Sequence, residues 1–142
     1  MNLLKDNEYM ALGLAVVGSR DFTDRDLACA WIDRVHLELG PFDLVISGGA
    51  RGADAIAEIW AKRNDIKMKV YLADWSKHGK RAGYIRNVDI IESSDFVIAF
   101  WDGKSRGTAH SIKISQTANK PLLVIDTTIG EINKEMSTVN IQ

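Results

Sequence analysis

VISGGARGAD, residues 45–54, joins the end of a short apolar run to a turn that holds three glycines within five positions. Residues 42–47 have the length and composition of a buried strand, and apolar residues recur at helical spacing from Gly52 onward. A helix start has unpaired backbone N–H groups and a partial positive charge, and a turn without side chains lets a phosphate group reach them. The stretch therefore predicts a strand-to-helix unit with the features of a phosphate-binding turn.

The same alternation of strand and helix extends along the chain on both sides of this unit. Near-continuous apolar runs predict five strands, at residues 13–20, 42–47, 68–74, 95–101 and 122–126. Helical spacing predicts four helices. The first runs from an N-cap at Thr23 to a stop at Gly40-Pro41, and the second begins at Gly52. The third ends at about Ser93, and the fourth covers about 108–118. This order predicts the α/β class, as a Rossmann-like three-layer sandwich with a mainly parallel sheet of about five strands.

Length and composition fit one domain over residues 1–142, with a core at about 13–126. The tail at 127–142 has weak periodicity, which leaves an edge strand, a short helix and neither of them open. The lone Cys29 is compatible with a reducing compartment, and no signal peptide or apolar run of about 20 residues is recognisable. We therefore expect a cytoplasmic protein that does not enter a membrane. The spacing of His, Cys and acidic residues predicts no metal site, and we expect no cofactor.

Unusual residues gather where the predicted strands end. In open parallel sheets, ligands bind beyond the carboxyl ends of the strands. The net charge is only −1, so composition gives no argument for an anionic partner. However, eight of the 18 Lys and Arg residues follow strand ends, which predicts one basic rim, formed by Arg20, Arg51, Lys77, Lys80, Arg81, Arg86, Lys104 and Arg106.

Two turns in the chain have the composition of a phosphate loop, GGARG at 48–52 and DGKSRGT at 102–108. The pattern GxxxxGK[ST] is absent, and GxGxxG fails because Ser47 stands in the first glycine's place. Asp74 lies where a dinucleotide fold places its ribose-binding acid, but the glycine turn follows the second strand and not the first. The alternative for the glycines is that they only permit tight helix–sheet packing or positive φ.

Aromatic residues add a second possible ligand contact. Trp75 and Trp101 end two strands, where an aromatic ring could stack on a nucleotide base. For Tyr84, the sequence allows two interpretations: its side chain caps the pocket, or it packs against the sheet. Asp54, near the start of its helix, is expected to brace the glycine turn without touching ligand. Arg86 has the alternative of a surface pair with Asp89 or Asp95.

The motif SGGARGAD, with GSRDF before it and DWSKHGKRAGYIRN and FWDGKSRGT after it, resembles the SLOG superfamily of Rossmann-like domains. The four ordered motifs match its small YspA-like branch, found in bacteria and phages, from about Gly13 to Asp126. This resemblance implies a ligand site built from these loops, with nucleotides or nucleotide-derived molecules as ligands, and a homo-oligomer. Members of this branch largely lack an established biochemical activity.

Two better-understood relatives suggest different functions. ISGGARGADAIAE is similar to the glycine loop of the DNA-processing protein A family, which binds single-stranded DNA. The second half resembles the LOG phosphoribohydrolases, in which an arginine precedes an aspartate by nine residues, as Arg86 precedes Asp95. Their PGGxGTxxE loop follows, and here Gly107-Thr108 match it, whereas WDGKSR replaces the PGG. The catalytic glutamate of that loop corresponds to Ser111, so the resemblance makes Arg86 a candidate catalytic residue and takes away the expected glutamate.

Three functions follow from this reading, in order of preference. The first is binding of a nucleotide or nucleotide-derived phosphorylated ligand, as a sensor or sequestering protein. The second is hydrolysis of an N-glycosidic or phosphate ester bond in such a nucleotide, and the third is binding of single-stranded nucleic acid. The predicted ligand-binding residues are Gly18, Ser19, Arg20, Ser47, Gly48, Gly49, Arg51, Gly52, Asp74, Trp75, Lys80, Arg86, Asn87, Trp101, Gly103, Ser105, Arg106, Gly107 and Thr108.

Overall fold

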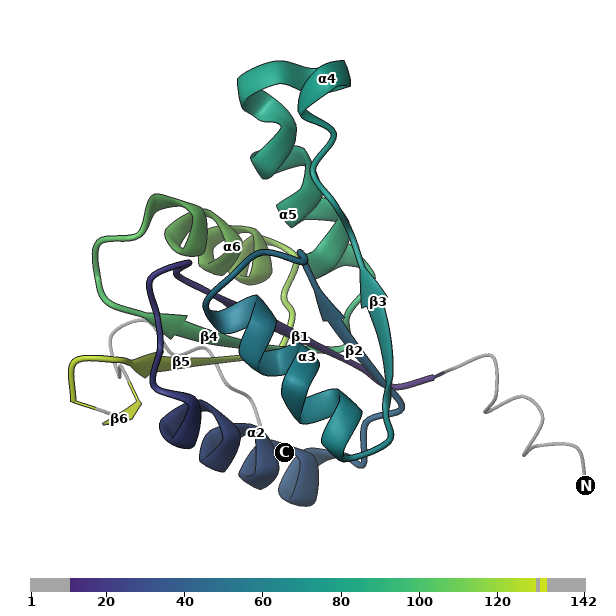
Figure 1. The fold of residues 1–142 in the computed structure, drawn as a ribbon, viewed down its shortest axis with the longest axis vertical. Helices are drawn as coiled ribbons and strands as arrows, with labels where there is room; N and C mark the ends of the chain where they lie inside the picture. Colours follow the sequence, from purple (N-terminus) through teal and green to yellow (C-terminus); the bar gives the residue numbers. More distant parts are fainter. Residues whose placement is uncertain (1–10, 130, 133–142) are drawn as a thin grey trace, which may run out of the picture.

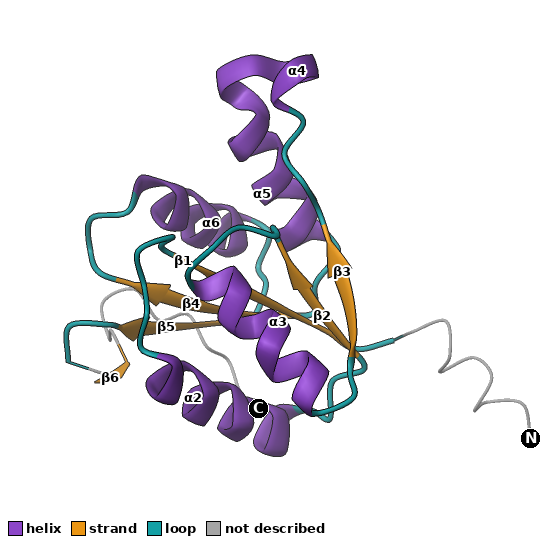
Figure 2. Ribbon diagram, in the orientation of Figure 1, coloured by secondary structure: helices purple, strands orange, loops and turns teal. Residues whose placement is uncertain are grey.

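A six-stranded sheet forms the centre of the computed structural model, which describes residues 11–129 and 131–132 (Figures 1 and 2). The strand order is β3-β2-β1-β4-β5-β6. The first five strands run parallel, and β6 pairs antiparallel with β5 at the edge. The strands are β1 (Gly13–Gly18), β2 (Leu44–Ser47), β3 (Lys67–Val70), β4 (Phe96–Trp101), β5 (Leu122–Asp126) and β6 (Glu131–Ile132).

Helices cover the sheet on both faces (Figure 1). The helical segments are α2 (Arg25–Leu39), α3 (Ala53–Arg63), α4 (Trp75–His78), the 3₁₀ turn η1 (Gly79–Arg81), α5 (Ala82–Glu92) and α6 (Arg106–Thr117). Helices α2 and α3 pack on one face, and α5 and α6 pack on the other. The structure is therefore the α/β Rossmann-like sandwich expected from the sequence, with a short sixth strand added.

Two cores, one on each face of the sheet, explain why the strands read as continuous apolar runs. Leu14 and Val16 of β1 belong to the core under α2 and α3, whereas Ala15 and Val17 belong to the core under α5 and α6. Successive side chains of a strand point to opposite faces, so a strand covered on both sides has to be apolar at every position.

The order of the strands creates a switch point between β1 and β4. The chain runs outward from β1 through β2 to β3, then crosses back so that β4 lies on the other side of β1. Gly18 of β1 pairs with Phe100 of β4, so the two carboxyl ends lie next to each other. The loops that follow these strands diverge, which opens a crevice above the sheet.

The segment after β3 differs from the expected continuous strand and loop. Strand β3 ends at Val70 and not at residue 74, and residues 71–74 form no regular structure. We call residues 75–84 the arm: they form α4, η1 and the first turn of α5, and most of their side chains are exposed. Figure 1 shows the arm projecting beyond the end of the sheet.

Three further local features refine the expectations from sequence. The N-cap of α2 is Asp24 and not Thr23, because the Asp24 side chain accepts the N–H of Leu27. The tail adds the edge strand β6, and residues 133–142 lie outside the described part of the chain. Within residues 11–129 and 131–132, no helix has the length and apolar character needed to cross a bilayer.

Candidate ligand-binding site

A cavity of about 580 Å³ lies at the carboxyl ends of β1 and β4. It has the size of a small-molecule pocket, which in proteins ranges over roughly 300–1,000 Å³. Its walls come from the end of β1 and the loop after it, the β2–α3 turn, the arm with α5, and the β4–α6 turn. The lining residues are Val17, Gly18, Ser19, Arg20, Asp21, Ala50, Asp54, Trp75, Lys80, Gly83, Tyr84, Arg86, Asn87, Ile90, Asp102, Lys104, Ser105, Gly107, Thr108 and Ser111.

Other parts of the protein occupy the space next to each glycine of the β2–α3 turn. A Cβ on Gly48 would lie 2.6 Å from Nη1 of Arg86, and one on Gly49 would lie 2.7 Å from Val70. A Cβ on Gly52 would lie 2.3 Å from the carbonyl oxygen of Ser19. These glycines are therefore needed for close packing, the alternative that the sequence left open.

Several backbone N–H groups of the same turn are also hydrogen-bonded within the protein. Gly49 donates to Oγ of Ser47 at 3.4 Å, and Ala50 donates to Oδ2 of Asp54 at 3.1 Å. Ala53 donates to the carbonyl oxygen of Ser19 at 3.3 Å. Asp54 braces the turn as expected, although the N-cap position itself is Gly52. This turn therefore already uses the N–H groups of Gly49, Ala50 and Ala53 within the protein.

The β4–α6 turn is open where the first turn is closed. A Cβ on Gly103 or Gly107 would meet no atom within 4 Å. Oδ1 of Asp102 accepts the N–H groups of Lys104 and Ser105, each at 2.8 Å, and these bonds hold the pKa of Asp102 below its ordinary value. Ser105 is the N-cap of α6.

Two donors at the start of α6 remain available. The N–H of Thr108 reaches Oγ of Ser105 at 3.4 Å. The N–H groups of Arg106 and Gly107 have no hydrogen-bond partner in the part of the chain that the structure describes, as expected for the first turn of a helix. Gly107 and Thr108 line the cavity, so the positive end of the α6 dipole borders it.

Arg86 connects α5 to the β2–α3 turn below the cavity. Its Nη1 donates to the carbonyl oxygen of Gly48 at 2.7 Å, in place of a surface pair with Asp89 or Asp95. Its buried Nε has no hydrogen-bond partner among residues 11–129 and 131–132. Burial lowers the pKa of the Arg86 guanidinium, although an arginine keeps its charge at neutral pH.

The charges on the cavity floor do not balance. Burial raises the pKa of Asp54, while its hydrogen bond from Ala50 and the nearby charges of Arg86 and Arg20 act to lower it. Two arginines thus face one partly buried carboxylate. Lys80 and Lys104 add two cations and Asp21 and Asp102 add two carboxylates, so the lining side chains have an excess of one positive charge. Uncompensated positive charge in a partly desolvated place favours an anion.

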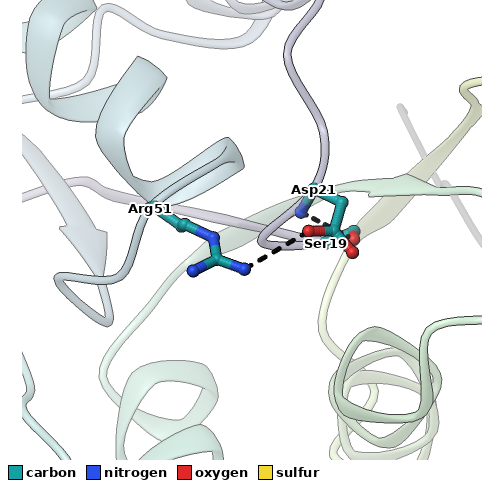
Figure 3. Close-up of polar contacts among 3 residues, drawn as sticks. All are labelled: Ser19, Asp21 and Arg51. Atoms are coloured by element: carbon teal, nitrogen blue, oxygen red, sulfur yellow. Dashed lines mark hydrogen bonds and ion pairs between the residues drawn. The ribbon is translucent and has the colours of Figure 1, made fainter.

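Arg51 takes no part in this cavity. Its Nη2 reaches Oδ1 of Asp21 at 3.4 Å, and the Asp21 N–H donates to Oγ of Ser19 at 3.1 Å (Figure 3). Both charged side chains are exposed, so the pair contributes little to stability. The contact turns the Arg51 guanidinium toward the β1–α2 loop.

Two aromatic side chains form the wall that faces the cavity from the arm. Trp75 is 52% exposed and Tyr84 is 48% exposed. The Tyr84 ring contacts the His110 ring edge-on, with centroids 4.5 Å apart. Nδ2 of Asn87 lies 3.3 Å from Nδ1 of His110 and donates to the carbonyl oxygen of Gly107 at 3.4 Å, which ties α5 to α6.

Ten of the residues expected from sequence line the cavity and nine do not. The nine are Ser47, Gly48, Gly49, Arg51, Gly52, Asp74, Trp101, Gly103 and Arg106. Asp74 instead caps α4, accepting from Oγ of Ser76 at 2.7 Å and from the N–H of Lys77, which lowers its pKa. The Trp101 indole donates to the carbonyl oxygen of Ser105 at 3.0 Å and so supports the β4–α6 turn.

The sequence-based prediction missed other lining residues for two reasons. Val17, Ile90 and Gly83 have no chemical signature of a site. Asp102 and Lys104 lie inside the DGKSRGT motif, and an acid three residues before an N-cap is a signal for such a turn. Ser111 lies at the cavity with 2% of its surface exposed. No three His, Cys, Asp or Glu side chains group to hold a metal ion within residues 11–129 and 131–132.

Comparisons with known proteins agree with this architecture. The Gene 61 protein of Mycobacterium phage D29 is 37% identical over 116 residues, which cover 76% of this chain and 91% of the phage protein. DNA processing protein A from Helicobacter pylori, for which a single-stranded DNA binding mode is described, superposes with a TM-score of 0.67 at 22% identity. That match covers 93% of this chain and 77% of the other.

A third similar structure is the molybdenum cofactor carrier protein of Chlamydomonas reinhardtii. It superposes with a TM-score of 0.59 at 18% identity, over 82% of this chain and 77% of the other. At these identities, the two structural matches establish a shared fold. The family YAcAr, described as the YspA, cpYpsA-related SLOG family, matches residues 13–78, which contain β1, β2, β3 and the glycine turn between β2 and α3. Together with the phage relative, this match shows that the chain belongs to the YspA-related SLOG family.

Proposed function

We propose that the protein binds a nucleotide or nucleotide-derived phosphorylated ligand in the cavity between β1 and β4, as a sensor or sequestering protein. The observation that carries this proposal is the open start of α6, where Gly107 leaves space and unpaired N–H groups border the cavity. Backbone donors at a helix start bind phosphate oxygens without needing any particular side chain.

The charged side chains support the same assignment. Arg20, Lys80, Arg86 and Lys104 come from four different segments and line one cavity. Cations that converge from separate elements surround a phosphate and form charge-assisted hydrogen bonds to its oxygens. Of the three lining aspartates, Asp102 accepts two backbone N–H groups and Asp54 accepts one, so both carboxylates are already engaged.

The proposal moves the phosphate from the turn that first suggested it. The β2–α3 turn uses several of its N–H groups internally and has its glycines packed, whereas the β4–α6 turn has open space at Gly103 and Gly107 and an unpaired N–H at Gly107. We therefore place the phosphate at α6, with Arg20 facing it from the β1–α2 loop. The β2–α3 turn then has a structural role, since it supports Arg86 and Asp54 below the ligand.

Binding without hydrolysis is the outcome we expect at this site. The position of the LOG glutamate is Ser111, whose hydroxyl cannot act as a carboxylate acid or base at neutral pH. The carboxylates of Asp54 and Asp102 already accept backbone N–H groups in the fold, and we therefore assign neither of them a catalytic role. Incubation with purine and pyrimidine monophosphates should release neither free base nor phosphate, and a turnover abolished by Arg86→Ala would reverse this assignment.

The direct test is calorimetry with a panel of nucleotides that includes ADP-ribose. A ligand at 100-fold excess over Kd should raise the unfolding free energy by about 2.7 kcal/mol. Arg20→Gln should weaken binding about tenfold or more, as expected for a lost hydrogen bond to a charged group. Arg51→Gln is the matched control, because Arg51 is exposed on the same rim outside the cavity, and it should bind normally. A panel without any binder would refute the proposal.

Single-stranded nucleic acid is a second candidate, favoured by the composition of the arm. Trp75 stands half-exposed beside Lys77, Lys80 and Arg81, and exposed aromatics among cations are typical of single-strand binding. The discriminating property is salt dependence. Binding to an oligonucleotide should weaken steeply between 50 and 200 mM salt if several phosphates are contacted. For a mononucleotide with one or two phosphate groups, affinity should fall much less over the same range of salt concentration.

A further inference from the structure

We propose that the ligand of this cavity has a planar aromatic base, which stacks on the indole of Trp75 with Tyr84 beside it. This inference rests on the proposed function and specifies its ligand as a nucleoside phosphate rather than a phosphorylated sugar or inorganic phosphate. It assigns to the arm the recognition of the base, and to the start of α6 the recognition of the phosphate.

The local structure holds Trp75 at the cavity even though half of its surface is exposed. Trp75 begins α4, and the Asp74 side chain fixes that start by accepting the N–H of Lys77 at 3.0 Å. Cη2 of the indole lies only 3.4 Å from where a Cβ of Gly83 would be, so the ring extends over a position without a side chain. Trp75 and Gly83 both line the cavity.

Tyr84 presents a second aromatic surface on the same wall. The interplanar angle of 69° to His110 places one ring against the other edge-on, which fixes Tyr84 from the α6 side. About half of the Tyr84 surface stays exposed at the cavity. Two large aromatic side chains are half-exposed at one wall, and a stacked ring would bury part of that exposed surface.

Other lining residues have the complementary chemistry. The open start of α6 and the cations Arg20 and Lys104 favour an anion, so the cavity offers both charged and aromatic contacts. A nucleoside phosphate has these two ends joined by a ribose, and inorganic phosphate or ribose 5-phosphate lacks the aromatic end. Because every base has a π-face, stacking on an indole favours bases without selecting strongly among them.

The experiment compares AMP, UMP and ribose 5-phosphate by calorimetry on the 142-residue chain. AMP and UMP should bind at least about tenfold more tightly than ribose 5-phosphate, within the range that stacking on an aromatic side chain provides. Trp75→Leu should remove most of this advantage and leave ribose 5-phosphate unchanged. Trp75→Phe should keep a substantial part of it.

Leu72→Ala is the matched control, since Leu72 is an exposed apolar side chain close to the arm in sequence but outside the cavity lining. It should leave all three affinities unchanged. The molar mass in solution, which reports the oligomeric state, is measured in parallel for wild type and Trp75→Leu. If Trp75→Leu changes the mass and weakens all three ligands equally, Trp75 is an interface residue between copies and the stacking proposal is wrong.

The remaining outcomes separate this inference from the proposed function. Equal affinity of wild type for AMP and ribose 5-phosphate refutes base stacking and leaves phosphate binding standing. Binding of none of the three ligands refutes both. Loss of the base advantage in Trp75→Leu alone, with an unchanged mass, supports both.

Discussion

Nη1 of Arg86 donates a hydrogen bond of 2.7 Å to the carbonyl oxygen of Gly48, which connects α5 to a turn 38 residues earlier in the chain. The bond is possible because Gly48 has no side chain: a Cβ would lie 2.9 Å from Cζ of the guanidinium. Gly48 and Arg86 therefore act as one unit, and the arginine that sequence comparison suggested as catalytic has a structural role in the protein without ligand.

Arg86→Ala should lower the unfolding free energy by about 1–3 kcal/mol, because the Gly48 carbonyl, on a buried residue, loses its donor. Urea denaturation of the ligand-free protein measures this change. Arg81→Ala, an exposed position on η1, is the control and should stay within about 0.5 kcal/mol of wild type. An Arg86→Ala protein as stable as wild type would show that the bond is dispensable.

Glycine substitutions should separate the packed turn from the open one. Gly52→Ala should destabilise the protein by about 1–3 kcal/mol or more, since its φ is +76° and its Cβ would overlap the Ser19 backbone. Gly107→Ala should instead stabilise α6 by about 0.5–1 kcal/mol. It should still weaken nucleotide binding, because the new methyl group occupies the space next to the phosphate site.

Thermal unfolding and calorimetry on the two glycine variants give both quantities. A Gly107→Ala protein with normal affinity would argue against a phosphate at α6. Conversely, a stable Gly52→Ala protein with reduced affinity would return the phosphate site to the β2–α3 turn.

Asp54→Asn should alter how stability depends on pH. The pKa of Asp54 is raised in the fold, so the native state holds its proton more tightly than the unfolded chain does. Stability of the wild type therefore falls as pH rises from the ordinary carboxyl range through this raised pKa. Asparagine can still accept the Ala50 N–H but does not titrate, so the stability of Asp54→Asn relative to wild type should increase with pH across this window.

Urea denaturation between pH 3.5 and pH 7 tests this dependence. A stability difference between the two proteins that is constant with pH would mean that burial does not penalise the Asp54 carboxylate.

Ser105→Ala should affect both the helix and the ligand. Oγ of Ser105 accepts the Thr108 N–H and lies 3.0 Å from Oγ1 of Thr108. Loss of an N-cap costs about 0.5–2 kcal/mol. Because the same helix start faces the cavity, nucleotide affinity should fall as well, and Ser105→Asn, which retains a capping group, should restore most of the stability. Unaltered stability in Ser105→Ala would contradict the capping role.

Periodicity predicted the sheet well because the interior strands are apolar on both faces. The fifth strand was expected at 122–126 and lies there as β5. The third was predicted to reach residue 74 but ends at Val70, since β3 lies at an edge and its exposed Lys67 and Lys69 give no apolar pattern from which to locate its end. Edge strands therefore remain the less predictable part of such a sheet.

The two glycine turns could not be distinguished from local sequence. Each has glycines, an arginine and a following helix. What separates them is which side chains fill the space next to each glycine, and those come from Arg86, Val70 and Leu72, far along the chain from Gly48 and Gly49. Tyr84 was undecided for the same reason, because its environment depends on His110 of α6.

The interlocked loops after β1 and β2 differ from the arm in how they tolerate substitution. The Ala53 N–H bonded to Ser19, and the contact of Gly52 with the same residue, couple these two loops, so a substitution in one disturbs the other. The arm packs mainly on α5 and carries mostly exposed residues. Single substitutions in the arm should therefore disturb the fold less than single substitutions in the two coupled loops.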